Sequence, residues 1–302
     1  MPIKFIAKQP VMIQFENKSP IQPFREIVAY EALWTEKNAS FKSLSELFKQ
    51  HPNSRPSDFV EGGKISELYE EIKKFVFNAN FRTGLLINGT FDYPEKLNDA
   101  KERVELLYYT GILEYLKTKC FAIVGTRNPS AESLAVTAEI ATKLVQDDYT
   151  IVSGLAYGID TQAHKSAIAA NGRTIAVLGT PLNRVYPREN KELQELIAKE
   201  HLLISQVPFY RYSKQTSLIN KKFFLERNKT MSALTEATLI VEAGETSGSL
   251  TQAVAAVHQG RKLLIWDTCF RNNNITWPQK FADKGAIRIS SYEQLITELN
   301  KK

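Results

Sequence analysis

The segment FAIVGTRNPSAESLAVTAEIATKLVQDDYTIVSG, residues 121–154, contains the pattern that decides the fold. It begins with the apolar stretch FAIVG (121–125), continues through a helix-length segment near 130–146, and ends on a second apolar stretch, TIVSG (150–154). Continuous apolar runs of strand length, separated by helices, are typical of a parallel sheet that is covered on both faces.

The same alternation continues to the end of the chain. Further strand-like stretches are TIAVLG (174–179), LLISQV (202–207), TLIVEA (238–243), LLIWD (263–267) and AIRIS (286–290). Helix-length segments near 159–171, 190–200 and 248–259 separate several of them, and Ser291 opens a short C-terminal helix. We therefore predict an α/β domain over residues 81–302.

Residues 1–80 have a different pattern. The stretches PFREIVAYEALW, SLSELFKQ and KISELYEEIKKFVF repeat apolar residues at a spacing of three to four, which predicts helices. We expect a small, mostly helical N-terminal domain, whose role the sequence leaves unclear.

The positive charge of the chain is concentrated in one segment. The 302 residues carry a net charge of +6. Residues 1–80 contain 11 basic against 10 acidic residues, whereas residues 205–230 contain six basic residues against Glu226 alone. A concentrated basic patch favours a phosphate-bearing partner.

Several other classes of protein fit the sequence poorly. No apolar run approaches the roughly 20 residues that a membrane span needs, and residues 1–18 lack a signal-peptide core. We expect a soluble, cytoplasmic protein with no membrane partner. The four histidines have no metal-ligand spacing, so no metal site is expected. Cys120 and Cys269 adjoin apolar runs and are expected to be reduced, half-buried thiols.

Four junctions between strands and helices are rich in Gly, Ser, Thr and Asn: GTRNPS (125–130), SGLAYGID (153–160), GTPLNRVYPREN (179–190) and EAGETSGS (242–249). Ligands of open α/β sheets bind at such junctions, where backbone N–H groups can meet an anion. Candidate ligand contacts are Gly125, Thr126, Arg127, Ser153, Gly154, Ser247 and Ser249. Simple turns and helix caps would explain the second and fourth junctions equally well.

The basic segment interleaves rings with cations. Phe209, Tyr210, Tyr212, Phe223 and Phe224 lie among its Lys and Arg residues. Single-stranded nucleic acid suits this composition, because bases stack on rings while phosphates meet cations. On a helix, neighbouring residues point about 100° apart, so we expect one of the last two rings in the core and the other facing a base.

Motifs of common enzymes and cofactor sites are missing. The sequence contains no G-x-G-x-x-G after a strand, no G-x-x-x-x-G-K-[ST] loop and no G-x-S-x-G elbow. No catalytic constellation stands out. We therefore expect a binding protein without enzymatic activity and without a cofactor.

Six stretches together resemble the DNA-processing protein A (DprA/Smf) family: AIVGTRNPS, VSGLAYGIDTQAH, TIAVLGTPLNRVYPREN, LISQVP, FFLERNK and TLIVEAGETSGSLTQA. They follow one another in order between about residues 90 and 290. The resemblance implies an extended Rossmann-like fold, with a parallel or mixed sheet flanked by helices. It also implies binding of single-stranded DNA in a positive pocket, a homodimer, and help in loading a RecA-type recombinase during natural transformation.

The resemblance also implies roles for individual residues. Gly125, Thr126 and Arg127 match the family's phosphate-binding motif, and Ser153 with Gly154 matches its second Gly-rich loop. The basic strip of the family, whose aromatic residue receives a base, corresponds to Lys221, Phe224, Arg227, Asn228 and Lys229. Two positions depart from the pattern: Tyr157 stands where Arg is common and adds a stacking surface, and Leu225-Glu226 makes the strip less basic.

A second interpretation comes from the related LOG-type nucleotide phosphoribohydrolases and their nucleotide-sensing relatives. Their catalytic loop resembles GETSGSLTQ (244–252) in placement, but Gln252 falls at the position of the catalytic Glu. An amide cannot act as a general base, which argues against hydrolysis. Nucleotide binding remains an open alternative.

Overall fold

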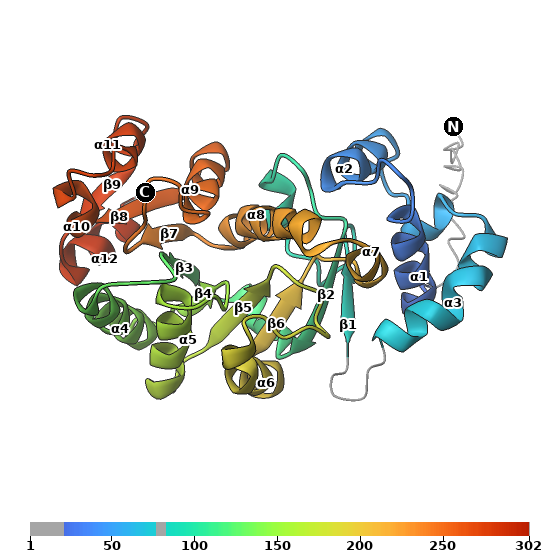
Figure 1. The fold of residues 1–302 in the computed structure, drawn as a ribbon, viewed down its shortest axis with the longest axis horizontal. Coiled ribbons are helices and arrows are strands. Elements are labelled where there is room, and N and C mark those ends of the chain that lie inside the picture. The colour runs from blue at the N-terminus through green and yellow to red at the C-terminus, as the bar shows by residue number, and fades with distance from the viewer. Residues whose placement is uncertain (1–20, 77–82, 302) are drawn as a thin grey trace, which may run out of the picture.

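The computed structural model describes residues 21–76 and 83–301, and the described chain is arranged around one nine-stranded sheet (Figure 1). Its strands are β1 (Gly84–Ile87), β2 (Leu106–Gly111), β3 (Cys120–Val124), β4 (Thr150–Ser153), β5 (Thr174–Leu178), β6 (Leu202–Ser205), β7 (Ala237–Ile240), β8 (Lys262–Trp266) and β9 (Ile287–Ile289). Their order is β1-β2-β6-β5-β4-β3-β7-β8-β9. Strand β2 pairs antiparallel with β1 and β6, and the other pairs are parallel. The predicted α/β fold with a mixed sheet is confirmed.

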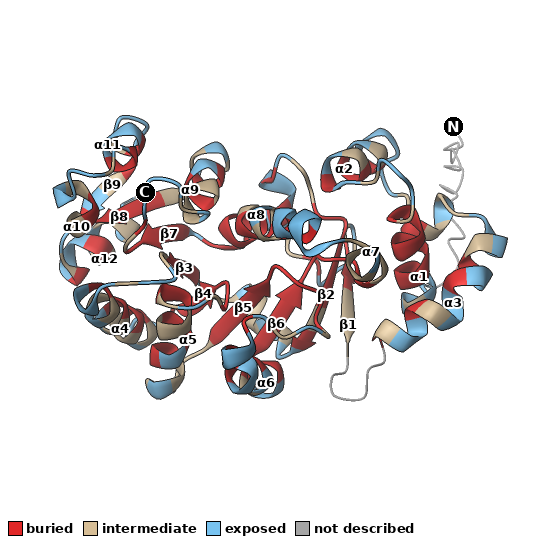
Figure 2. Cartoon of the chain, in the orientation of Figure 1, coloured by how far each residue is buried: buried red, intermediate tan, exposed pale blue. Residues whose placement is uncertain are grey.

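Helices cover both faces of the sheet. They are α4 (Ala131–Gln146), α5 (Ile159–Ala169), α6 (Lys191–Glu200), α7 (Phe209–Lys214), α8 (Ser217–Leu234), α9 (Ser249–His258), α10 (Asp267–Arg271), α11 (Trp277–Ala282) and α12 (Tyr292–Asn300). In β3, Phe121 and Ile123 pack into a cluster with α4, α5 and α12, while Ala122 and Val124 pack with α8 and α9. This alternation, with burial on both sides (Figure 2), explains why the strand is apolar throughout.

The order in which successive strands are added to the sheet reverses at β3. On one side β3 pairs with β4, from which the chain continues to β5 and β6; on the other side it pairs with β7, which leads to β8 and β9. Such a reversal leaves a crevice at the carboxyl ends of the two diverging strands. The loops there are joined, because the backbone N–H of Thr126 donates to the carbonyl of Glu242 at 2.7 Å.

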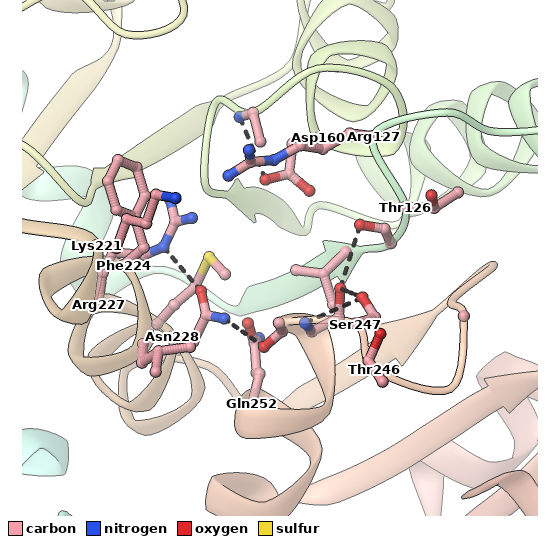
Figure 3. A pocket seen from close by; sticks show the side chains of 18 of the residues that line it. Thr126, Arg127, Asp160, Lys221, Phe224, Arg227, Asn228, Thr246, Ser247 and Gln252 are labelled. Atoms are coloured by element: carbon pink, nitrogen blue, oxygen red, sulfur yellow. Dashed lines mark hydrogen bonds between the residues drawn. The ribbon is translucent and has the colours of Figure 1, made fainter. Parts of the chain in front are cut away.

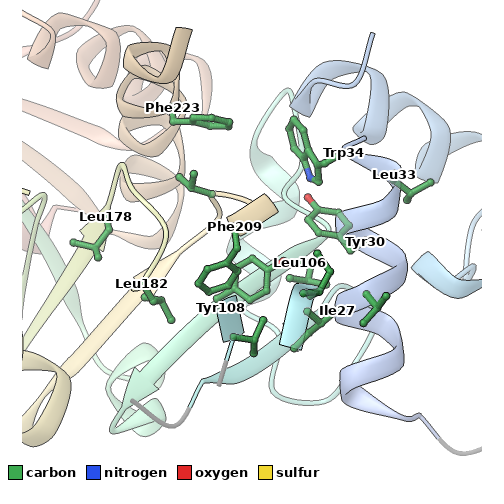
Figure 4. Packing of buried hydrophobic residues seen from close by; sticks show 14 of the residues in the cluster. Ile27, Tyr30, Leu33, Trp34, Leu106, Tyr108, Leu178, Leu182, Phe209 and Phe223 are labelled. Atoms are coloured by element: carbon green, nitrogen blue, oxygen red, sulfur yellow. The ribbon is translucent and has the colours of Figure 1, made fainter. Parts of the chain in front are cut away.

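Three helices precede the sheet: α1 (Pro23–Leu33), α2 (Phe41–Gln50) and α3 (Gly62–Val76). Their apolar residues share one cluster with β2 and α7 (Figure 4). Buried Glu31 strengthens this contact, since it accepts hydrogen bonds from the Tyr108 hydroxyl (2.6 Å) and from the backbone N–H groups of Phe209 (2.8 Å) and Tyr210 (3.0 Å). The expected boundary between residues 80 and 81 and residues 1–18, in which no signal peptide was expected, lie outside the described residues.

The structure differs from the sequence-based expectations in two details. Strands β1 and β2 were not expected; they are the antiparallel edge of the sheet, and β1 is only four residues long. Cys120 and Cys269 are free but buried, rather than half-buried. Within residues 21–76 and 83–301, no helix combines the length and apolar content required to span a bilayer, and no cluster of three metal-ligating side chains occurs.

Candidate nucleic-acid interface

A cavity of about 570 Å³ lies at the crevice, between helix α8 and the loops that follow β3, β4 and β7 (Figure 3). Nine of the predicted site residues line it: Gly125, Thr126, Arg127, Lys221, Phe224, Arg227, Asn228, Ser247 and Ser249. The structure thus brings together segments that lie up to 124 residues apart in the sequence.

The loop after β3 is held close to its neighbours. A Cβ on Gly125 would lie 2.6 Å from the Ile159 side chain and 2.8 Å from the Glu242 carbonyl, so only glycine fits there. The carboxylate of Glu242 accepts from the backbone N–H (2.9 Å) and hydroxyl (3.0 Å) of Ser130, the N-cap of α4. These contacts fix the loop, and they leave the exposed Arg127 side chain at the cavity without a hydrogen bond or ion pair in the described structure.

The start of α9 is fastened to the same loop. Ser249 donates its hydroxyl hydrogen to the Gly125 carbonyl at 3.2 Å. Ser247 donates to the Ser249 hydroxyl at 3.1 Å and accepts from the Ser249 backbone N–H at 3.3 Å. The Ser249 hydroxyl therefore connects the two loops that form this wall of the cavity, and Ser247 supports Ser249.

Arg227 is a buried cross-link rather than an exposed cation. Only 5% of its surface is exposed. Its Nη1 donates to the carbonyls of Gly154 (2.5 Å) and Val177 (2.7 Å), and its Nε donates to Asn228 Oδ1 (2.8 Å). Asn228 in turn donates to the Gly248 carbonyl at 2.9 Å. Together these two residues fasten α8 to strand β5 and to the loops after β4 and β7.

The two neighbouring rings of α8 point to different places. Phe223 is buried, with its ring centroid 6.2 Å from that of Trp34 and 6.1 Å from that of Phe41. Phe224 is half-buried and lines the cavity, 5.3 Å from the Tyr186 ring. The Arg227 guanidinium carbon lies 6.0 Å from the Phe224 centroid. A base contact at Phe224 stays a prediction.

The charge around the cavity is positive. Its charged lining residues are Arg127, Lys221 and Arg227 against Asp160. Burial raises the pKa of the Asp160 carboxyl, and the positive charge of Arg227 opposes that rise. Asp160 Oδ2 accepts from the backbone N–H of Ala156 at 3.3 Å, so it shapes the loop after β4. Lys221 is exposed and, like Arg127, makes no hydrogen bond or ion pair within the described residues.

Four predicted residues do not reach this cavity. Ser153 is fully buried and donates to the Ile123 carbonyl at 2.7 Å, and Gly154 lies beneath Arg227. Tyr157 lines an adjoining hollow. Lys229 lies on another face of α8, which it shares with Lys222 and Glu226 through i, i+4, i+7 spacing.

Lys229 is also neutralised where it lies. Its ammonium group is 2.9 Å from the Glu226 carboxylate and 3.3 Å from that of Glu102. The structure therefore does not place Lys229 in a basic strip with Lys221. Glu226 lies on the same face of α8 as Lys229 and does not line the cavity, so it does not reduce the charge of the cavity directly.

Other lining residues were not among the predicted ones: Asp160, Tyr186, Met231, Thr246 and Gln252. Asp160, Tyr186 and Thr246 lie within three of the four strand–helix junctions that were expected to bind a ligand. Their position in those junctions could have indicated that they line the site. Gln252 is fully buried; its Nε2 donates to Thr238 Oγ1 at 3.1 Å. Its Oε1 has no hydrogen-bond partner in the described structure.

Comparison with known proteins places the chain among proteins of DNA processing. Residues 84–300 match the family described as DNA recombination-mediator protein A. The chain is 35% identical over 208 residues to DNA processing protein DprA of Bacillus subtilis, covering 68% of each chain. It is 38% identical over 206 residues to DNA processing protein DprA of Streptococcus pneumoniae, covering 68% of this chain and 71% of that one. It is 40% identical to Protein Smf of Synechocystis, but spans only 49% of that protein.

Solved structures show the same fold. The X-ray structure of DNA processing protein A from Streptococcus pneumoniae superposes with a TM-score of 0.68 at 25% identity, covering 92% of this chain and 94% of that one. The structure of DNA processing protein A from Helicobacter pylori, which was described for its single-stranded DNA binding mode, gives a TM-score of 0.62 at 28% identity. It covers 72% of this chain and 96% of that one.

Proposed function

The chain belongs to the DNA recombination-mediator protein A family, and from this premise we propose that it binds single-stranded DNA in the cavity at α8. The observation that carries the proposal is the pairing of a half-buried ring, Phe224, with two cations, Arg127 and Lys221, that have no hydrogen bond or ion pair among residues 21–76 and 83–301. A ring beside free cations suits a strand whose bases and phosphates are both exposed.

In the proposed complex, two kinds of side chain contact two different parts of the strand. Arg127 and Lys221 meet phosphates, and Phe224 stacks on one base. Every base offers a π-face and every nucleotide carries the same phosphate, so such contacts bind without reading sequence. Because the Gly125 loop and α8 are already fastened by Ser249 and Arg227, little of the site needs to be ordered when DNA binds.

Replacing Phe224 by Ala tests the base contact. Loss of one stacking surface is expected to cost about 1–3 kcal/mol of binding free energy, which is roughly a 5- to 150-fold rise in Kd. Fluorescence anisotropy with a labelled oligothymidine at low salt measures it, with a duplex of the same length and free nucleotides as competitors. An unchanged Kd for the variant, or no preference of the wild type for single strands, would contradict the proposal.

The competitors also address the alternative function. If mononucleotides displaced the oligothymidine as well as unlabelled oligothymidine does, the cavity would be a nucleotide-sensing site of the LOG-related kind. We propose instead that a single nucleotide competes poorly, because it offers one phosphate and one base where the strand offers several.

We further propose that the protein acts without catalysis, in the cytoplasm, as a homodimer that helps to load a RecA-type recombinase during transformation or related DNA processing. Support comes from the family, whose description names recombination mediation. Light scattering coupled to gel filtration tests the dimer. RecA filament growth on DNA coated with single-strand-binding protein, with and without this chain, tests the loading.

A further inference from the structure

A second hollow, of about 380 Å³, adjoins the cavity. It is lined by residues of the loop after β4 and the loop after β5, and it shares Arg127, Ala156 and Tyr186 with the first cavity. The two hollows therefore adjoin at these three residues. A ligand longer than one nucleotide would reach both if it passed over the shared residues.

Two exposed rings distinguish the second hollow. Tyr157 is 39% exposed and Tyr186 is 46% exposed, and both line it. Among the described residues only two other aromatic side chains are similarly exposed, Tyr69 and Phe91, and neither lines this depression. Half of the strongly exposed rings of the described chain thus line one hollow, next to the proposed DNA site.

The loop that carries Tyr157 is positioned closely. Gly158 has φ of +76°, and a Cβ there would lie 2.5 Å from the Thr126 carbonyl and 2.8 Å from that of Arg127. Only glycine allows the two loops to approach so closely, and the approach sets Tyr157 beside Arg127. The interaction of the Tyr157 hydroxyl with the Glu189 carboxylate, which lines the same hollow, raises the pKa of Tyr157 and lowers that of Glu189.

The two hollows are related through two residues. Tyr186 lines both and contacts the Phe224 ring, with centroids 5.3 Å apart. Arg127 also lines both, and it has no hydrogen bond or ion pair within the described part of the chain. A cation at the junction of two ring-lined hollows matches the repeat of a nucleic-acid strand, in which one phosphate joins two bases.

Building on the proposed function, we propose that Tyr157 and Tyr186 form a second base-stacking subsite, and that Arg127 contacts the phosphate between the bases in the two hollows. The recognised unit is then a dinucleotide. Arg188 adds a second cation at the far hollow, and Arg127 and Arg188 together outweigh Glu189, so the hollow tolerates a phosphodiester.

The test compares ligands that differ by one base. Binding of d(TpT) is measured by calorimetry at low salt, together with d(TpX) and d(XpT), in which X is an abasic residue. The wild type is expected to bind d(TpT) about 5- to 150-fold more tightly than either abasic ligand, since one stacked base is lost. With Tyr157→Ala the advantage over one of the two abasic ligands is expected to disappear, because the base in the second hollow has lost its ring, whereas the advantage over the other ligand, which Phe224 provides, remains.

Two further variants sharpen the comparison. Tyr157→Phe keeps the ring and removes only the hydroxyl contact with Glu189, so it is expected to retain the d(TpT) advantage. Phe91→Ala removes an exposed ring remote from both hollows and is expected to match the wild type. A d(TpT) advantage over both abasic ligands that survives in Tyr157→Ala, or that is absent from a wild type that binds longer oligothymidine, overturns the second subsite.

Failure of the second subsite can be distinguished from failure of the proposed function. If the wild type binds single strands and Phe224→Ala weakens them while Tyr157→Ala has no effect, then only the second subsite is wrong. If the wild type binds no single strand, the proposed function itself fails. Thermal unfolding of each variant tests whether loss of folding is the cause. Because Tyr157 is exposed, its replacement is expected to leave folding unchanged.

Discussion

The two ends of helix α8 use similar residues for different purposes. Near the carboxyl end, Arg227 is buried and bonds to the Gly154 and Val177 carbonyls, and Lys229 is held between two carboxylates. Near the amino end, Lys221 and Lys222 are exposed and have no hydrogen bond or ion pair within the described residues. One half of the helix is scaffold, and the other half presents charge to solvent.

The wider basic segment 205–230 divides in the same way. Four of its six cations bond to other parts of the protein: Arg211, Lys214, Arg227 and Lys229. Such cations hold the site together but offer little charge to a ligand. Local charge density in a sequence therefore overestimates the charge that a partner meets, and burial and pairing decide which cations remain available.

The largest effect is expected at the scaffold end. Arg227→Met keeps most of the side-chain volume but leaves two buried carbonyls without a donor and Asp160 without its neighbouring positive charge. We expect a loss of about 3–5 kcal/mol in the free energy of unfolding, measured by urea denaturation. Lys221→Met on the same helix is the control and is expected to change stability by less than about 0.5 kcal/mol.

A stability loss at Arg227 no greater than that at Lys221 would remove the distinction between the two ends. DNA binding by Arg227→Met is also expected to weaken, but as a consequence of a displaced Gly154 loop. Gly154→Ala provides an independent check, because the added Cβ would lie 2.1 Å from the guanidinium and must displace it. Both variants are expected to disturb the same loop.

The comparison also shows what the sequence could predict. The strands around the crevice were predictable, because strands buried on both faces must be continuously apolar, as in FAIVG and TIVSG. Antiparallel β1 and β2 lacked that signal. At the site, the Gly125 loop and Phe224 were predicted, since close approach and helical spacing are local properties.

Pairing across the fold was not predictable. Glu102, which neutralises Lys229, lies 127 residues away in sequence, and nothing near either residue indicates the contact. Arg227 was predicted as a DNA contact because it matches the basic strip of the family. Its burial depends on a carbonyl just after β4 and another within β5, which only the folded sheet brings within reach.

An effect of intermediate size is expected at Glu31, the scaffold acid that joins α1 to α7. Burial raises the pKa of Glu31 to about 7 from an ordinary value of 4.5, against the effect of its hydrogen bonds from Tyr108, Phe209 and Tyr210. Between these two pH values the folded chain retains a proton that the unfolded chain has released. Stability from this group is therefore greatest below about pH 4.5 and falls as the pH rises to about 7, by about 3 kcal/mol at most.

Glu31→Gln removes this titration, so the measurement is the difference in unfolding free energy between wild type and variant from pH 5 to pH 8. The difference is needed because buried His164, whose pKa burial lowers to about 3, contributes a slope of opposite sign up to about pH 6.5. The wild type is expected to lose stability relative to the variant as the pH rises. Parallel curves would show that Glu31 ionises as an ordinary carboxyl.

The smallest effect is expected at the solvent-facing end, and it sharpens the comparison because it concerns binding alone. Lys221→Gln should leave the unfolding free energy unchanged, whereas one lost phosphate contact should make the slope of log Kobs against log salt shallower by about 0.7 for a single strand. Neighbouring Lys222 lines a different hollow with Trp34 and Phe41, so Lys222→Gln is the matched control. If both variants change the slope equally, charge anywhere on the exposed half of α8 suffices; if only Lys221→Gln does, the cation must lie in the Phe224 cavity.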